Sequence, residues 1–247
     1  MTPITNEPLR VRTTAIGLLS FAAAEEQLLL TTATRSNGQH PGGPDRWAAV
    51  PLVAHNTDFR RQQVQRLDAV RNGTVPPAFT EIDHSSAEVY QGYCQPAGAV
   101  AEASRQSTQE LIAGLSAIPD EDLLDPARNP WLGGRQLWLQ IVVRGFWHPT
   151  GHLGDYYIAH GHPDRAVALH TQGAGWARYL NAPDAAQGMA CYNLACAQAR
   201  SGHPGDAFDA LSEAVALNSD LLANAARDAD LGSLRDHGKL DALLGYG

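Results

Sequence analysis

Two histidines of the chain have the spacing of metal ligands. His148 and His152 lie four residues apart in RGFWHPTGHLGDYYIAHGH, so on a continuous helix both rings project from one face, with Cβ atoms about 6 Å apart. A third ligand must come from another helix, and His55 in VAHNTDF is the candidate. Three neutral imidazoles that leave one position to water are typical of a catalytic metal site, because the ion's charge then acidifies that water.

The same histidines also fit an ordinary core helix. An H-x-x-x-H pair arises by chance often enough in a chain with ten histidines, and a core histidine bonded to a backbone carbonyl is common. His160 and His162 lie at the predicted helix end, where histidine interacts favourably with the helix dipole, so we interpret them as structural. Spacing alone leaves both interpretations open. No partner at useful spacing is available to His84, His170, His203 and His237.

A proline between the two paired histidines predicts a distorted helix. Pro149 has no N–H to bond the carbonyl of Gly145, and its ring crowds that carbonyl. Glycine at the crowded position tolerates altered dihedral angles better than any other residue. We therefore predict a kink or widened turn that helps aim His148 at the bundle interior.

Several side chains near these histidines could act on a substrate. Arg144 lies four residues before His148 and could hold a carboxylate or phosphate, although an ion pair explains it equally well. Asp58 and Asp155 each lie three residues from a candidate ligand and could accept a hydrogen bond from an imidazole, although solvated helix charges are the simpler interpretation.

Aromatic residues and one cysteine complete the candidates. Tyr90, Tyr93 and Trp147 could wall a pocket, but aromatics at helical spacing more often belong to the core. Cys94 could be a nucleophile only if a neighbour depressed its pKa, and the sequence shows no such cation. The predicted catalytic residues are Arg144, Asp58 and Tyr90, and the predicted metal ligands are His55, His148 and His152.

Helix signals dominate the chain and no alternating strand pattern competes with them. Four long helices with short or medium connections favour an all-α helical bundle. Asp45 is the expected N-cap of the second helix, and the acidic, proline-rich segment 118–134 is expected to be non-helical. The predicted helices are 8–33, about 47–70, 86–117 and 134–160.

The chain after residue 160 has the character of a helical repeat. GHPDRAVAL, beginning at Gly161, resembles GHPGDAFDAL, beginning at Gly202, with an alanine five residues after each glycine. The small and apolar positions of one tetratricopeptide unit match Leu194, Ala195, Gly202, Ala207, Leu211 and Ala214. We expect a bundle over residues 1–160 and helical hairpins over 161–247, packed on the bundle because two repeats are too few for an independent solenoid.

Composition narrows the class of protein. A chain of 247 residues with 44% hydrophobic content can bury a real core, and a net charge of -8 argues against a nucleic-acid partner. Three cysteines without a C-x-x-C pair fit a reducing compartment, so we expect the cytoplasm. No apolar run approaches the roughly 18 residues of a membrane span. The run AIGLLSFAAA is expected to be helix rather than signal peptide, because one apolar stripe crosses it through Ile16, Leu19, Ala23, Gln27 and Leu30.

Two segments carry a family resemblance. WAAVPLVAHNTDF and FWHPTGHLGDYYIAHG resemble the DinB-like superfamily of four-helix bundles, which includes thiol-dependent isomerases and transferases and the ClbS/DfsB self-resistance proteins. The resemblance covers roughly Pro8 to Gly161. In metal-bearing members one histidine comes from the start of the second helix and two from an H-x-x-x-H in the fourth. That pattern implies His55, His148 and His152 as the ligands here.

The expected function is that of a metal-dependent enzyme acting on a small electrophilic molecule by hydrolysis or thiol transfer. Zinc or nickel suits imidazole ligands, and a low-molecular-weight thiol could be the cosubstrate. A close variant is a self-resistance or detoxification protein that opens or sequesters a reactive natural product. The alternative is a non-catalytic binding or scaffold protein that uses the tetratricopeptide-like tail. A homodimer is compatible with either.

Overall fold

The protein is described by a computed structural model in which the regular elements are helical. The described residues are 7–32, 43–80, 82–83, 85–236, 238 and 243. Within these ranges the chain forms α-helices, 3-10 turns and a π-helical turn but no strand, so the predicted all-α fold class is confirmed. None of the helices in these ranges combines the length and apolar character needed to cross a membrane. Predictions that lie outside the described residues concern His84, His237 and the side chain of Asp45.

Contacts within the chain divide it into two compact units, Met1–His152 and Leu153–Gly247. The division falls inside helix α7 (His148–Ala159), so this helix ends the first unit and begins the second. The boundary at residues 160 and 161 and the packing of the tail on the bundle stay predictions.

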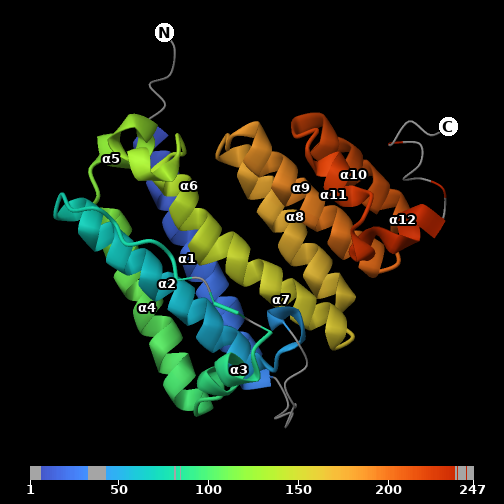
Figure 1. Cartoon of the computed structure of the whole chain (residues 1–247), viewed down its shortest axis with the longest axis horizontal. Helices are drawn as coiled ribbons and strands as arrows, with labels where there is room; N and C mark the ends of the chain where they lie inside the picture. Colours follow the sequence, from blue (N-terminus) through green and yellow to red (C-terminus); the bar gives the residue numbers. More distant parts are fainter. Residues whose placement is uncertain are drawn as a thin grey trace. The chain divides into compact units, whose positions relative to one another are not determined.

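Long helical segments make up most of the first unit (Figure 1). Helix α4 packs against both α1 and α2, and α6 with its continuation packs against α1. Three of these segments lie close to the predicted first, second and fourth helices. The segments are α1 (Glu7–Thr32), α2 (Ala49–Arg71), α4 (Ala97–Ala117) and a composite helix in which α6 (Leu137–Val142) continues through the π-helical turn η4 (Val143–Trp147) into α7.

The prediction of one continuous third helix over residues 86–117 is wrong. This stretch consists of α3 (Ala87–Tyr93) and α4, with Pro96 as the N-cap of the second piece. Proline has no N–H for a helical hydrogen bond and disfavours helical dihedrals in the residue before it, so the chain turns there. Ser86 caps α3 by accepting a hydrogen bond from the N–H of Val89 at 3.5 Å.

The acidic segment 118–134 is more regular than predicted. It contains one short α-helix and two 3-10 turns, each of which begins with or just after a proline. Proline fits the first turn of a helix because the N–H that it lacks would have no partner there. These elements are α5 (Asp120–Leu124), η2 (Pro126–Arg128) and η3 (Pro130–Leu132).

The buried face of α1 differs from the predicted stripe. Of the five predicted positions, only Leu19 is buried, because the true face is rotated and includes the charged residue Glu26. A carboxylate can occupy a core position when a buried cation pairs with it. The buried residues of α1 are Val11, Ala15, Leu18, Leu19, Ala22, Glu26 and Leu29.

The partner of Glu26 is Arg60 of α2, and both side chains are almost fully buried. The two terminal nitrogens of Arg60 donate to the two carboxylate oxygens of Glu26 at 2.9 and 2.7 Å. Arg60 Nε donates to Ser107 Oγ at 3.1 Å, and Ser104 Oγ donates to Glu26 at 2.7 Å. This Glu26–Arg60 layer, made of Glu26, Arg60, Ser104 and Ser107, joins α1, α2 and α4 with its hydrogen bonds satisfied.

The second unit consists of helical hairpins. Helix α9 packs against both α8 and α10, and the short elements that follow pack on α9 and α10. The order of elements is α8 (Pro163–Tyr179), α9 (Asp184–Arg200), α10 (Pro204–Leu217), α11 (Leu221–Ala225), η5 (Ala229–Leu231) and α12 (Gly232–Asp236).

The two turns of the predicted repeat have the same conformation. Gly161 and Gly202 have φ of +79° and +81°, a region that favours glycine. The histidine after each is an N-cap, with φ and ψ of -118° and 51° at His162 and -112° and 64° at His203. A proline at the first helical position follows both. The repeated sequence therefore produces a repeated turn.

Candidate metal centre

His55 is fixed by the start of α2 and by the aromatic rings around it. Its side chain is fully buried in the second turn of the helix. The ring contacts Trp47, Phe59 and Tyr93, with centroid distances of 5.7, 4.8 and 5.8 Å. Trp47 is itself buried, so it anchors the chain where α2 begins. One candidate ligand is therefore held rigidly in an apolar wall.

His148 is positioned by the π-helical turn η4. Its N–H bonds the carbonyl of Val143, five residues back, instead of the residue four back. Pro149 donates no hydrogen bond, and the hydroxyl of Thr150 donates to the carbonyl of Phe146 at 2.8 Å. The predicted widened turn beside His148 is confirmed.

Gly145 lies inside this turn for a steric reason. A Cβ atom built on it would be 2.1 Å from Cδ2 of Leu19 and 3.1 Å from Cδ2 of Leu111. Both leucines are fully buried core residues of α1 and α4. The sequence predicted dihedral freedom as the role of this glycine. The structure gives another reason: Leu19 of α1 and Leu111 of α4 approach the π-helical turn so closely that they leave no space for a side chain.

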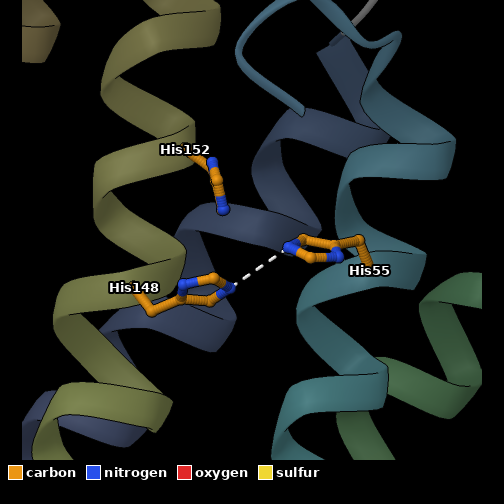
Figure 2. A group of neighbouring side chains, drawn as sticks. All are labelled: His55, His148 and His152. Atoms are coloured by element: carbon orange, nitrogen blue, oxygen red, sulfur yellow. Dashed lines mark hydrogen bonds between the residues drawn. The ribbon is translucent and has the colours of Figure 1, made fainter. Parts of the chain in front are cut away.

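The three predicted ligands converge, as Figure 2 shows. Nε2 of His148 and Nε2 of His55 are 3.2 Å apart, a distance at which one ring donates a hydrogen bond to the other. The ring of His152 lies 5.0 Å from that of His55 and 4.5 Å from that of His148, between centroids. One ring nitrogen from each residue lies within 4.8 Å of the other two.

This geometry fits one transition-metal ion. Two nitrogens bound to a tetrahedral ion at about 2.0–2.1 Å are about 3.3–3.4 Å apart. The separation of 3.2 Å between His55 and His148 is close to that value. His55 is buried, whereas His148 and His152 are partly exposed. The group could therefore hold a metal ion.

The predicted catalytic residue Asp58 lies beside a tyrosine of this wall. Its carboxylate hydrogen-bonds the hydroxyl of Tyr93, and burial together with this carboxylate raises the pKa of Tyr93 far above its usual range. Asp58 also lies 3.9 Å from the guanidinium of Arg61. Since Tyr93 contacts His55, Asp58 acts on the wall of the site through that tyrosine.

Tyr90, the second predicted catalytic residue, lies one layer further out. It is buried and packs edge-on against Trp47 with a centroid distance of 5.4 Å. Burial, and then the neighbouring Cys94, raise the pKa of its hydroxyl. The ring of Trp47 contacts both Tyr90 and His55, so it separates Tyr90 from the histidine. Asp155, the other carboxylate considered, forms an ion pair with Arg200.

The third predicted catalytic residue, Arg144, lies against aromatic rings. Its guanidinium carbon is 4.3 Å from the centroid of Phe79 and 5.3 Å from that of Phe59. The Phe59 ring in turn stacks on His148 at 4.3 Å. Among the described residues no carboxylate pairs with Arg144, so the ion pair considered as its explanation is absent from the described chain.

The sequence analysis missed Arg66 and Phe79, which lie beside Arg144. Arg66 follows His55 by 11 residues, about three helical turns, so the two lie on one face of α2; this spacing could have revealed it. Phe79 belongs to the loop after α2, where the N–H of Thr80 donates to Gln62 at 2.9 Å. Its position depends on that tertiary contact, and no local pattern predicts it.

A second group of possible ligands has a structural explanation. Cys196, Asp228 and Asp230 lie within 4.8 Å of one another in the second unit. Tyr192 donates a hydrogen bond to Asp228 at 2.7 Å, and Arg200 lies 3.5 Å from Asp230. Burial and the two carboxylates raise the pKa of the Cys196 thiol far above its usual range, so it stays protonated. These contacts account for the cluster without an ion.

Comparison with known proteins adds no further assignment. No protein-family model, curated protein or solved structure matches the chain. The DinB-like resemblance therefore depends on the two quoted segments, and the candidate metal centre depends on the geometry of its three histidines.

Proposed function

We propose that the protein is a metal-dependent enzyme that acts on a small electrophilic molecule by hydrolysis or by thiol transfer. The observation that carries this proposal is the convergence of three imidazoles from two helices, with their ligand nitrogens within 4.8 Å of one another. In this proposal the first unit is a DinB-like bundle and the second a tetratricopeptide-like extension.

Three histidines would hold the ion, which is zinc or nickel in this proposal because imidazole suits both. When bound, such an ion supplies Lewis acidity, which lowers the pKa of water or of a thiol and polarises an electrophile. His55 provides the buried ligand, and the partly exposed His148 and His152 leave the outer side of the group accessible. Three protein ligands leave room for a reacting group.

The surrounding residues exclude water and hold the ligands in place. Trp47, Phe59 and Tyr93 surround the His55 ring, and Phe59 also stacks on His148. The Tyr93 hydroxyl is protonated at neutral pH, and burial and the neighbouring Asp58 carboxylate raise its pKa further. Tyr93 is therefore a rigid donor rather than a base. The wall imposes one orientation on His55 before any substrate binds.

Hydrolysis and thiol transfer differ in the nucleophile that must enter. Cys94 is exposed at the end of α3, and the buried Cys191 and partly buried Cys196 lie in the second unit. In this proposal the thiol in a transfer reaction is a low-molecular-weight cosubstrate. A self-resistance protein that opens a reactive natural product would use the same electrophile chemistry.

The metal content of the untagged full-length protein tests the proposal. After reconstitution with zinc or nickel and removal of excess ion, elemental analysis should give one ion per chain. His55→Ala, His148→Ala and His152→Ala should each lose it, whereas His162→Ala should retain it because His162 caps α8 at a repeat turn. Activated esters and epoxides, assayed with and without a thiol, should be consumed only by the loaded wild-type protein.

Metal removal gives an independent readout. An ion that binds only the folded chain stabilises it by about 3–4 kcal/mol at 100–1,000 times its Kd. A chelator should therefore lower the melting temperature of the loaded wild-type protein and leave that of His148→Ala unchanged. Stoichiometric metal in all three alanine variants, or none in the reconstituted wild type, would remove the metal centre.

A further inference from the structure

Two arginines from different elements converge on one aromatic ring beside the candidate metal centre. The guanidinium carbons of Arg66 and Arg144 lie 4.2 and 4.3 Å from the centroid of Phe79. Arg66 also lies 4.5 Å from the centroid of Trp131 in η3. Helix α2, the π-helical turn, a loop and a 3-10 turn therefore meet at a doubly charged cluster, formed by Arg66, Arg144, Phe79 and Trp131.

Among the described residues, the Nε–H groups of these two arginines have no acceptor. Nε of Arg66 and Nε of Arg144 are both buried and unbonded, and within the described chain neither arginine forms an ion pair. The side chain of Arg66 is only 9% exposed. Aromatic rings satisfy the faces of a guanidinium through cation–π contact, but its N–H groups point outward in the guanidinium plane. The two Nε–H donors, which are unbonded in the described chain, are therefore available to a ligand.

Among the described residues no carboxylate forms an ion pair with the two arginines of the cluster. Burial and then the charges of Arg144 and Arg135 lower the pKa of Arg66, and burial and then Arg135 lower that of Arg144. Arginine remains protonated in proteins, so the cost of bringing like charges together is not relieved by proton loss. An anion bound between the guanidinium groups would relieve it and would supply acceptors for their free N–H groups.

The cluster is continuous with the histidines through a single ring. Phe59 stacks on His148 at 4.3 Å, and Arg144 lies 5.3 Å from the same ring. Phe59 also stacks on Phe79 at 6.2 Å, the ring that both arginines contact. A small molecule whose charged end lies between the arginines would therefore extend along these rings towards the three histidines.

We infer that Arg66 and Arg144 bind an oxyanion group of the substrate, a carboxylate or a phosphate, while its electrophilic end lies at the three histidines. The planar forks of two arginines match the paired oxygens of either group. The assignment to a substrate rests on the proposed function. Binding of the oxyanion itself rests only on the arginine cluster, so the two can fail separately.

Titration of the metal-free, full-length protein with inorganic phosphate, and separately with acetate, tests the inference. Tryptophan fluorescence is a suitable signal because Trp131 contacts Arg66. At constant ionic strength and neutral pH, one of the probes should give a saturable change that is absent with chloride and lost in Trp131→Phe. Tighter binding of phosphate would indicate a phosphorylated substrate, and tighter binding of acetate a carboxylate.

Matched variants locate the binding. Arg66→Gln and Arg144→Gln should each raise the Kd about tenfold or more, as expected for loss of charged hydrogen bonds. Arg71→Gln, an exposed arginine on the same helix, should leave the Kd unchanged. Melting curves establish that the variants fold, and Arg66→Lys, which keeps the charge but loses the fork, should bind with intermediate affinity.

The outcomes separate this inference from the proposed function. His148→Ala should bind the oxyanion as wild type does while holding no metal. Absence of metal from the reconstituted wild type would overturn the proposed function and leave oxyanion binding standing. The inference would be overturned, whatever the metal content, if neither probe bound the wild type or if Arg66→Gln and Arg144→Gln bound with wild-type affinity.

Discussion

Helix α2 carries two buried arginines, six residues apart, whose surroundings are opposite. Arg60 donates to both oxygens of Glu26 and to Ser107, and Ser104 donates to the same carboxylate. Arg66 lies over two aromatic rings and near the charge of Arg144, and its Nε has no acceptor among the described residues. Six residues correspond to about 240° around a helix, so the two point to different sides.

The contrast separates a structural charge from one suited to a ligand. A buried ion pair whose hydrogen bonds are complete has no donor left for a ligand, and it fixes which helices meet. A buried cation with free donors and no counter-ion is costly in the free protein, and a bound anion reduces that cost. The first unit therefore contains a closed polar layer, the Glu26–Arg60 layer, and an open one, the cluster around Arg66 and Arg144.

The largest expected effect on stability comes from removing Arg60 from the Glu26–Arg60 layer. Arg60→Met leaves the Glu26 carboxylate buried without its cation, which should lower the free energy of unfolding by about 3–5 kcal/mol. Urea denaturation followed by circular dichroism measures this loss. In the double variant Arg60→Met/Glu26→Leu much of the stability should return, since no uncompensated charge remains. An Arg60→Met protein as stable as wild type would refute a structural role for the layer.

The candidate metal centre could be predicted from the sequence because its determinants are local. Residues four apart on a helix share a face, which brought His148 and His152 together before any fold was known. Pro149 predicted the distortion beside them, because a missing N–H is a property of the residue itself. The convergence with His55 needed the bundle architecture, for which the family resemblance supplied the expectation.

The polar layers could not be predicted because their determinants are distant in sequence. Glu26 was placed off the buried stripe of α1, since nothing local reveals a cation 34 residues later that neutralises it. Phe79 lies in a loop without periodicity, and only its contacts with two arginines give it a role. Pro96, by contrast, was a local signal that should have divided the predicted third helix.

His170, in the second unit, differs from the two buried arginines because burial keeps its side chain neutral rather than charged. Burial, and then the charge of Arg200, lower the pKa of His170 from 6.5 to about 4. As pH falls, the unfolded chain binds this proton first, so stability should fall between about pH 6.5 and pH 4. The full loss is on the order of 3 kcal/mol. Urea denaturation across this pH range should show a smaller pH dependence for His170→Gln.

The matched control is His162→Gln, an N-cap residue whose ring is exposed. It should keep the pH dependence of wild type. If His170→Gln lost stability in acid as steeply as wild type, other groups would be responsible for the acid sensitivity.

A smaller effect should follow from crowding the turn that positions His148. In Gly145→Ala the new methyl group would meet Leu19, and overpacking of this kind costs about 1–3 kcal/mol. The higher helix propensity of alanine returns up to about 1 kcal/mol, so we expect a net loss of about 1–2 kcal/mol. Leu19→Ala in the same chain should cost less than it does alone. Simple addition of the two losses would contradict direct contact.

The smallest effect on stability should come from replacing Arg66 in the arginine cluster. A small effect there, beside a large one at Arg60, is the informative result. Arg66→Met removes a buried cation that has no counter-ion among the described residues, and it relieves repulsion from Arg144. Methionine keeps an apolar chain of similar length against Phe79 and Trp131. Loss of the cation–π contacts destabilises the fold, whereas removal of the cost of burying the charge stabilises it. Because the two effects oppose each other, the free energy of unfolding should lie within about 1 kcal/mol of wild type. Urea denaturation beside Arg60→Met measures both ends of the comparison in one experiment. A loss as large as that of Arg60→Met would mean that Arg66 holds the fold together, and the difference between the two arginines of α2 would disappear.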